Sequence, residues 1–257
     1  MNILIPMAGE GVRFKNEGYK TPKPLIEVMG KPMVVQAADS LPKGKNYIFV
    51  CRYFHITEYA IDKELEKYYP GCKVITVDKL TEGQASTCLL AKEYINNDTP
   101  LMIGASDNGM LYDRNKFALA AADADCLVFT FRNNQTVVPK PQQYGWVKVD
   151  DKLNATAVSV KVPVSDNPIN DHAVVGSFWF KRGKDFVQAT ERMIAKNRRV
   201  NNEFYVDECI NEVIEAGLKV KAFEIDYYIC WGTPNDLRTF TYWQEFFSKM
   251  PFHPYKK

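Results

Sequence analysis

A loop near the start of the chain combines glycines with fixed positive charge. Residues 7–26, MAGEGVRFKNEGYKTPKPLI, follow a short apolar run and carry Gly9, Gly11, Arg13 and Lys23. Glycines let the backbone approach a bulky anion and direct N–H groups toward it. A guanidinium grips phosphate oxygens as a two-pronged donor, whereas an ammonium acts as a point charge. The loop therefore predicts a phosphate-binding site, against the plainer alternative of a surface turn with solvated charges.

The spacing within this loop does not match the two commonest phosphate loops. It lacks the Gly-Lys-Ser/Thr ending of one, and the third glycine of the other would fall at position 14, where Phe14 stands. The loop is also longer than the roughly 2–6 residues usual between a strand and a helix. Long loops in compact domains are often functional, so a different phosphate chemistry is indicated.

The elements that would position this loop alternate between strand and helix. In the first half we expect strands at 2–7, 46–51, 73–77, 100–105 and 126–131, and helices at 33–41, 55–69, 83–95 and 114–123. The second half is richer in strands, which are expected at 144–150, 155–164, 172–180 and 219–225, with helices at 183–197, 206–217 and 234–249. Such alternation predicts a Rossmann-like α/β fold: an open, mostly parallel mixed sheet with helices on both faces and a smaller β-rich lobe. Ligands bind at the carboxyl ends of the strands in such sheets.

Composition excludes several classes of protein. The chain has 257 residues and a formal net charge of +2, without the strong basic bias of a nucleic-acid-binding protein. No apolar stretch is long enough to span a bilayer, and the first strand begins at Asn2, which leaves no room for a signal peptide. The six cysteines form no Cys-x-x-Cys pair and mostly lie in apolar runs, as free thiols in a cytoplasmic protein would.

Three motifs together resemble one known family. A Gly-x-Gly-x-Arg loop at 9–13 is followed by Pro-Lys-Pro-Leu at 22–25 and by Gly-Lys-Pro at 30–32. This order resembles the signature of the sugar-phosphate nucleotidyltransferases, or nucleotide-sugar pyrophosphorylases. The resemblance extends along most of the chain and weakens after residue 150. It implies one domain over 1–257, with a nucleotide-binding half at about 1–135 and an acceptor-binding half at about 136–257.

The resemblance also implies roles for individual residues. Arg13, Lys23 and Asp107 would be catalytic, with Arg13 on the departing pyrophosphate and Lys23 at the α-phosphate. The nucleotide would be bound by a set of residues in two loops: Ala8, Gly9, Gly11, Gly83 and Gln84. The phosphorylated acceptor would meet Gly145, Lys161 and Gly176. Glu203 and Asp207 are candidates either for capping the next helix or for contacting a sugar.

The resemblance implies Mg²⁺ as the cofactor, with Asp107 as its ligand. In the family a second aspartate precedes a Gly-Thr-Pro segment, and here that position is Cys230 in YYICWGTP. A thiol is a poor ligand for Mg²⁺. Asp226 lies four residues earlier, roughly 13 Å along a strand, which is too far to replace it. The metal would then rest on Asp107, the triphosphate and water, or the activity would be changed or lost.

The expected reaction moves a nucleoside monophosphate from a nucleoside triphosphate to a sugar 1-phosphate and releases pyrophosphate, in nucleotide-sugar and polysaccharide biosynthesis. Phosphates are good nucleophiles, so positioning and charge neutralisation suffice, and none of the histidines at 55, 172 and 253 is needed.

Three alternatives stay open: a cytidylyltransferase for a non-sugar phosphate such as phosphocholine, a non-catalytic nucleotide-binding relative, and a glycosyltransferase using the Asp-x-Asp at 123–125. The partners would be the triphosphate and the acceptor, with no nucleic acid or membrane, and a homo-oligomer is open. The sequence does not name the base or the acceptor.

Overall fold

Nine strands form one mixed sheet. The computed structural model describes residues 1–250 and 252. The strands are β1 (Asn2–Pro6), β4 (Asn46–Arg52), β5 (Lys73–Val77), β6 (Leu101–Ile103), β8 (Cys126–Phe131), β9 (Gly145–Val149), β10 (Ala155–Val160), β11 (His172–Phe180) and β12 (Val220–Glu224). Their order is β10-β9-β11-β6-β1-β4-β5, with β8 paired to β11 and β12 paired to β8.

The sheet is parallel in its first half and mixed in its second. β1 runs parallel to β4 and β6, and β4 runs parallel to β5. β11 is antiparallel to β6, β8 and β9, and β9 is antiparallel to β10. The predicted α/β fold with antiparallel additions is confirmed, and the additions extend the main sheet itself. β11, from the second half of the chain, thereby joins strands of both halves into one sheet.

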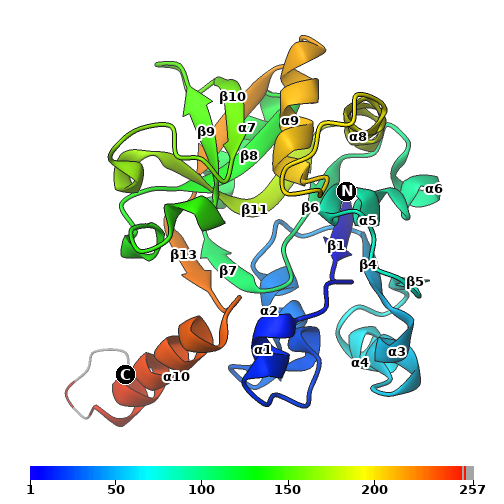
Figure 1. Cartoon of the computed structure of the whole chain (residues 1–257), viewed down its shortest axis with the longest axis vertical. Helices are drawn as coiled ribbons and strands as arrows, with labels where there is room; N and C mark the ends of the chain where they lie inside the picture. Colours follow the sequence, from blue (N-terminus) through cyan, green and yellow to red (C-terminus); the bar gives the residue numbers. More distant parts are fainter. Residues whose placement is uncertain (251, 253–257) are drawn as a thin grey trace.

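Helices cover both faces of the sheet (Figure 1). The α-helices are α1 (Val12–Asn16), α2 (Met33–Asp39), α3 (Tyr53–Thr57), α4 (Ile61–Tyr68), α5 (Gln84–Leu89), α6 (Lys92–Ile95), α7 (Arg114–Ala122), α8 (Gly183–Ala195), α9 (Val206–Glu215) and α10 (Pro234–Lys249). Short 3₁₀ helices are η1 (Lys23–Leu25), η2 (Gln135–Val137), η3 (Pro141–Gln143) and η4 (Pro168–Asn170). One apolar core joins α5, α6, α8 and α9 to the sheet, and another joins α2, α4 and α7 to it. Both cores are made by fully buried aliphatic and aromatic side chains, whose removal from water is the main stabilising term.

Two ribbons of short strands lie outside the sheet. β7 (Asn108–Leu111) pairs antiparallel with β13 (Tyr227–Cys230), and β2 (Glu27–Val28) pairs with β3 (Lys31–Pro32). A third apolar cluster includes Phe14, Met33, Trp231 and Leu237. It joins the N-terminal loop to the start of α10, so these two segments from opposite halves of the sequence pack together.

The sequence-based assignment of helices and strands was wrong in three places. The expected helix at 55–69 is two helices, because Ala60 takes a left-handed conformation with φ 49°. The expected helix at 83–95 is likewise divided into α5 and α6. The helix expected at 114–123 is confirmed as α7, but Asn108–Leu111 before it form the strand β7, which was not predicted. The local pattern cannot reveal β7, because its partner β13 lies more than a hundred residues away.

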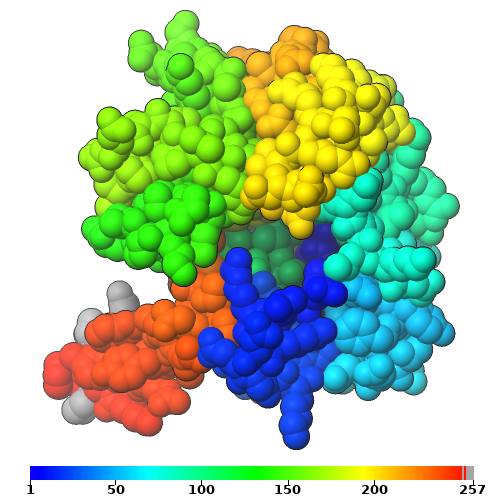
Figure 2. All heavy atoms as spheres, in the orientation of Figure 1, coloured from blue at the N-terminus to red at the C-terminus, as the bar shows by residue number. Residues whose placement is uncertain are grey.

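The loops that follow β1, β5 and β6 end on the same edge of the sheet because these strands are parallel. In the space-filling view this edge is a hollow in the centre of the molecule (Figure 2). The blue N-terminal loop borders it on one side, and the yellow segment before α9 and the green segment after β8 border it on the other.

Candidate active site

The hollow contains two adjoining cavities. The smaller one, of about 330 Å³, is lined by the loops after β1, β5 and β6. The larger one, of about 490 Å³, is lined by residues from β9, β11, the start of α9 and the β13–α10 connection. Ala105 and Asp107 line both cavities. A molecule in one cavity would therefore be in contact, near Asp107, with a molecule in the other.

The smaller cavity gathers most of the residues predicted to bind nucleotide. It is lined by Ala8, Gly9, Gly11, Lys23, Gly83, Gln84 and Asp107, together with Glu203. Gly11 takes a left-handed φ of 64° and is the N-cap of α1, a conformation that favours glycine. Gly83 has φ 121° and a backbone so close to Phe204 that a Cβ would lie 2.6 Å from its N and O atoms. Glycine at position 83 thus allows the close approach of two backbone segments.

The larger cavity gathers the residues predicted to meet the acceptor. Gly145, Lys161 and Gly176 all line it. Gly176 has φ 89° and lies within β11 where the register with β8 shifts, so it is also the strand irregularity that glycine often marks. Arg13, predicted to bind the triphosphate, lines this cavity and is not among the residues of the smaller one. The roles of all these residues stay predictions.

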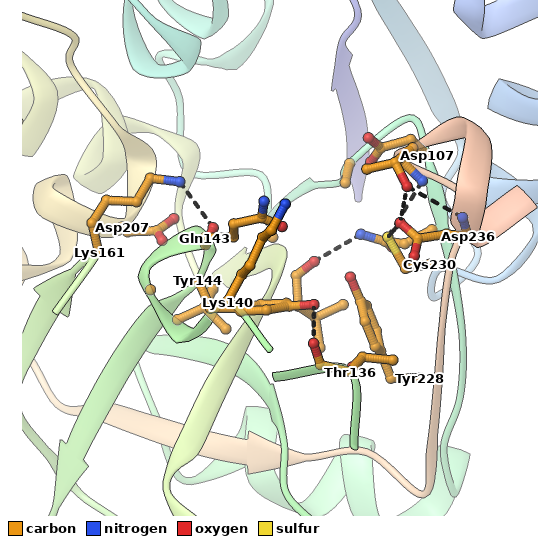
Figure 3. Close-up of a pocket in the computed structure, with 18 of the residues that line it drawn as sticks. Asp107, Thr136, Lys140, Gln143, Tyr144, Lys161, Asp207, Tyr228, Cys230 and Asp236 are labelled. Atoms are coloured by element: carbon orange, nitrogen blue, oxygen red, sulfur yellow. Dashed lines mark hydrogen bonds between the residues drawn. The ribbon is translucent and has the colours of Figure 1, made fainter. Parts of the chain in front are cut away.

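One end of the larger cavity holds a lysine and an aspartate. Lys161 Nζ donates a hydrogen bond to the carbonyl oxygen of Gln143 at 2.9 Å, and Asp207 lies beside it (Figure 3). Burial lowers the pKa of Lys161, partly offset by the Asp207 charge. Desolvation raises the pKa of Asp207 to about 6, although Lys161 opposes the shift. A Cβ on Gly145 would lie 2.0 Å from Asp207 Oδ2, so glycine makes room for this carboxylate.

Asp207→Asn is expected to stabilise the protein increasingly as pH rises from 5 to 7.5. The pKa of Asp207 is raised in the folded state, so the folded protein binds this proton more tightly than the unfolded chain. Ionisation therefore destabilises the folded state as pH passes from about 4 to about 6. The melting temperatures of both proteins at the two pH values measure this, with Asp226→Asn as the exposed control. A difference that does not change with pH would show that Asp207 has an ordinary pKa.

The other end of the cavity brings Asp107, Cys230 and Asp236 together (Figure 3). Asp107 forms an ion pair with Lys23, which lines the smaller cavity. Cys230 Sγ lies 3.6 Å from Asp236 Oδ2, and a Cβ on Gly232 would lie 2.9 Å from Asp107 Oδ2 and 3.3 Å from Cys230 Sγ. Burial and the nearby Asp107 charge raise the pKa of Cys230 to about 12. The thiol is thus a neutral group between two carboxylates.

These residues fit a hard divalent cation that is held in large part by phosphate oxygens. Asp107 offers carboxylate oxygen where the two cavities meet, and carboxylates suit Mg²⁺. Within residues 1–250 and 252, no group of three or more His, Cys, Asp and Glu side chains has the arrangement of a metal centre. Lys23 pairs with Asp107 and balances its charge. Asp107 would hold such a cation, which would neutralise charge on the transferred phosphate.

Cys230→Asp tests whether this position still faces the metal. The substitution places a third carboxylate beside Asp107 and Asp236, so without metal it should lower the free energy of unfolding by about 2–3 kcal/mol. Mg²⁺ should restore more stability to this variant than to the parent or to Cys230→Ser, the neutral isosteric control. Thermal melts with EDTA or with Mg²⁺ measure this. An equal loss under both conditions would separate Cys230 from the metal position.

Sequence reasoning missed part of the larger cavity. Thr136, Lys140, Gln143 and Tyr144 line it from the segment after β8, and Asp236 lines it from the first turn of α10. That segment has only two short 3₁₀ helices, so no periodic pattern marked it. Neither Glu203 nor Asp207 caps α9: the N-cap is Tyr205, with no side-chain hydrogen bond.

Neither the Asp-x-Asp segment of the glycosyltransferase alternative nor the described histidines lie at the two cavities. Asp123 of the Asp-x-Asp segment pairs with Lys219 at 2.5 Å and Lys221 at 2.9 Å, and neither it nor Asp125 lines the two cavities. His55 and His172 are buried away from both cavities, and His253 lies outside the described residues. All six cysteines are free, four of them buried, as expected, while Cys72 and Cys230 are partly exposed.

The fold and the site define an α/β protein in which a glycine-rich loop with Arg13 and Lys23 lies beside two adjoining cavities. The family model described as nucleotidyl transferase matches residues 3–244, so the chain belongs to the nucleotidyl transferase family of enzymes. It is 25% identical over 224 residues to the bifunctional protein GlmU of Campylobacter curvus, covering 87% of this chain and 48% of that protein. The chain thus spans about half the length of this curated relative.

Solved structures share the fold. A nucleoside-diphosphate-sugar pyrophosphorylase from Vibrio cholerae superposes with a TM-score of 0.76 at 21% identity, covering 93% of this chain and 98% of that one. The inositol-1-phosphate CTP transferase of T. maritima superposes with a TM-score of 0.68 at 14% identity, covering 93% of each chain. No helix within residues 1–250 and 252 combines the length and the apolar character needed to cross a bilayer.

Proposed function

We propose that the protein transfers a nucleoside monophosphate from a nucleoside triphosphate to a sugar 1-phosphate or a similar polyol phosphate, with release of pyrophosphate. The observation that carries the proposal is the pair of cavities that meet at Asp107. One is lined by a glycine-rich cationic loop and the other by Lys161, Lys140 and Arg13. This arrangement suits two phosphorylated substrates whose reacting groups must meet between them.

The chemistry follows from the charges. A phosphate oxygen of the acceptor attacks the α-phosphorus of the triphosphate, the new P–O bond forms, and the bond to the β-phosphate oxygen breaks as pyrophosphate leaves. Lys23 lies in the cavity wall beside Asp107, where it can neutralise the α-phosphate. Lys161 and Arg13 can neutralise the charge of the acceptor phosphate. The Arg13 guanidinium can also bind the negative charge that develops on the departing pyrophosphate. Preorganised cations of this kind lower the barrier without any protein nucleophile.

The aromatic residues of the larger cavity favour a polyol over phosphocholine. A quaternary ammonium is recognised by open aromatic faces. The three tyrosines that line this cavity already contact other protein groups. The rings of Tyr228 and Tyr144 pack against Phe131, stacked at 4.1 Å and edge-on at 5.9 Å between ring centroids. The centroid of the Tyr205 ring lies 5.3 Å from Lys161 Nζ. The hydroxyl, amide and carboxylate groups of Thr136, Gln143 and Asp207 are suited to hydroxyl-rich acceptors.

A screen for pyrophosphate release tests the proposal. ATP, CTP, GTP, UTP and dTTP would each be combined with Mg²⁺ and with glucose 1-phosphate, mannose 1-phosphate, N-acetylglucosamine 1-phosphate, inositol 1-phosphate or phosphocholine. We expect release that depends on both substrates, with a polyol phosphate preferred. Release with phosphocholine alone would favour the cytidylyltransferase alternative. Thermal stabilisation by triphosphates without release in any combination would favour a non-catalytic relative.

The location and the assembly state belong to the same proposal. Free thiols at all six cysteines support a cytoplasmic location, where such thiols stay reduced. A homo-oligomer stays a prediction that the mass of the protein in solution would test.

A further inference from the structure

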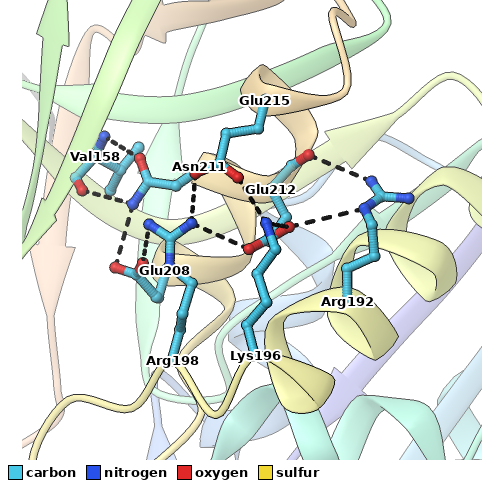
Figure 4. A network of polar contacts seen from close by, with 8 residues as sticks. All are labelled: Val158, Arg192, Lys196, Arg198, Glu208, Asn211, Glu212 and Glu215. Carbon is cyan, nitrogen blue, oxygen red and sulfur yellow. Dashed lines mark hydrogen bonds and ion pairs between the residues drawn. The ribbon is translucent and has the colours of Figure 1, made fainter.

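The helices that cover the sheet have partners on both of their faces. The apolar face of α9 belongs to the first core, together with that of α8. On the other side of α9, Glu212 is 1% exposed and pairs with Lys196 at 2.9 Å and with Arg198 at 3.0 Å (Figure 4). A buried carboxylate is costly unless paired, and here it is paired twice. The apolar and the charged groups of α9 are thus both satisfied within one molecule.

The second half of α10 differs from these helices. Its first half packs on the body: Pro234 and Leu237 are buried, and the Phe240 ring lies 5.7 Å from that of Trp231. Every residue from 241 to 249 is exposed. Figure 1 shows α10 running outward from the end of β13, away from the sheet. So short a helical segment gains little stability on its own in water, and most of its stability has to come from packing.

This exposed half has an apolar face made of aromatic rings. Tyr242, Trp243, Phe246 and Phe247 are 62%, 49%, 42% and 39% exposed. The Trp243 ring lies 5.4 Å from Tyr242 and 5.8 Å from both Phe246 and Phe247, so the rings form one continuous patch. The rest of this half is polar: Thr241, Gln244, Glu245, Ser248 and Lys249. An apolar helix face normally packs on another surface, and contiguous exposed patches mark interaction sites. We call these four residues the aromatic face.

The spacing of the aromatic face is the same in both chain directions. The four positions are symmetric about the point between Gln244 and Glu245. A second α10 packed antiparallel would therefore bring Tyr242 of each copy to Phe247 of the other, and Trp243 of each copy to Phe246 of the other. A two-fold interface requires a surface that is complementary to itself, and aromatic pairs stabilise such contacts. Antiparallel packing also places the two bodies at opposite ends of the helix pair.

Charge and area both suit a second copy of the chain. The aromatic face carries no charge, and Glu245 and Lys249 pair with each other at 3.5 Å, so two copies would meet without repulsion. A membrane surface would favour a basic polar face, whereas this one has one acidic and one basic residue. At about 200–250 Å² for each aromatic side chain, the four rings expose roughly 450 Å² per copy. Two copies would bury about 900 Å² of ring surface, close to the about 1,000 Å² of a small specific interface.

We propose that the aromatic face of α10 is the interface of a homodimer in which the two α10 helices pack antiparallel. The contact covers the four rings and supplies the packing that the second half of the helix lacks within one molecule. Residues 241–249 line neither of the two cavities, so this inference does not rest on the proposed function.

Sedimentation equilibrium of the whole protein over a range of concentrations tests the dimer. We expect a monomer–dimer equilibrium with a Kd of about 1–100 μM, as suits an interface of this size. Trp243→Gln and Phe246→Gln should each raise this Kd about tenfold or more, because aromatic residues at the centre of an interface dominate its affinity. Glutamine is a good helix former, so α10 itself is retained. The matched control is Leu119→Gln, at a position in α7 that is 73% exposed, and it should leave the Kd unchanged.

Mixing two charged variants tests the direction of the helices. Tyr242→Lys and Phe247→Glu should each weaken the dimer when studied alone. In an equimolar mixture, antiparallel packing places the new lysine of one copy against the new glutamate of the other and keeps one native Tyr–Phe pair. The mixed dimer should therefore have a Kd at least about tenfold lower than either variant alone. A mixture of Tyr242→Lys with Trp243→Gln, which offers no such pair, should show no recovery.

Three results would overturn the proposal. A parent protein that stays monomeric at all concentrations has no such dimer, and a dimer that survives both glutamine substitutions uses another surface. Binding of the monomeric parent to vesicles of phosphatidylglycerol and phosphatidylcholine, abolished by Trp243→Gln, would assign the aromatic face to a membrane. Recovery in neither mixture, with dimerisation lost in the single variants, would show that the helices do not pack antiparallel.

Discussion

Asp107→Asn is expected to reduce turnover at saturating Mg²⁺ by about 10²–10³-fold, the loss typical of removing one preorganised electrostatic group. Asn keeps the size of the side chain but removes the charge at the point where the two cavities meet. It would bind a hard cation weakly, and it would leave Lys23 without its charged partner. The dependence of kcat on Mg²⁺ concentration measures this loss.

The matched control for that variant is Asp226→Asn. Asp226 directly precedes β13, as Asp107 directly precedes β7, and it lines neither of the two cavities. Its substitution should leave both kcat and the Mg²⁺ titration unchanged. An Asp107→Asn enzyme that is folded and has the parent's Mg²⁺ titration would place the metal on other ligands.

Gly83→Ala is expected to lower the free energy of unfolding by about 3 kcal/mol or more and to disrupt nucleotide binding. Gly83 has φ 121° and ψ 177°, a conformation that residues with a Cβ rarely adopt. The new Cβ would also lie 2.6 Å from two backbone atoms of Phe204, which cannot rotate away as a side chain would. Urea unfolding and the thermal shift caused by triphosphates measure the two effects.

Gly71→Ala separates the two causes. Gly71 also has a positive φ, 77°, but nothing lies within 4 Å of its Cβ position. Its substitution should cost only about 1 kcal/mol, the usual penalty for a left-handed conformation. If both alanine variants lose the same stability, the close approach of Gly83 to Phe204 does not matter energetically.

The first half of the fold was predictable because its strands and helices have local periodic patterns. Residues 2–6, 46–52 and 73–77 are apolar runs between turn signals, and the structure places them side by side as parallel strands. The pattern failed where pairing is distant: β7 forms only because β13 lies beside it, and the pairing of Cys230 with Asn108 has no local signal. The predicted helix boundaries were wrong where a single residue leaves the helical conformation, as Ala60 does between α3 and α4.

The candidate site was predictable to the extent that its residues lie at the carboxyl ends of strands. Gly9, Gly11, Lys23 and Asp107 follow β1 or β6, and they meet in one cavity. Lys140 and Asp236 were missed because they reach the larger cavity from an irregular segment and from a helix start. No spacing rule connects such positions with a sheet edge.

The pairing of β8 has a consequence for how the chain is made. Both partners of this strand, β11 and β12, come later in the sequence. β11 also pairs with the edge of β6 that β1 leaves open. During synthesis, an unpaired apolar strand and an open sheet edge therefore wait for residues 172–180 to leave the ribosome, a state prone to aggregation. Translation speed and chaperone supply over that stretch should therefore determine the yield of soluble enzyme, and a fragment that stops near residue 135 should be insoluble when expressed alone.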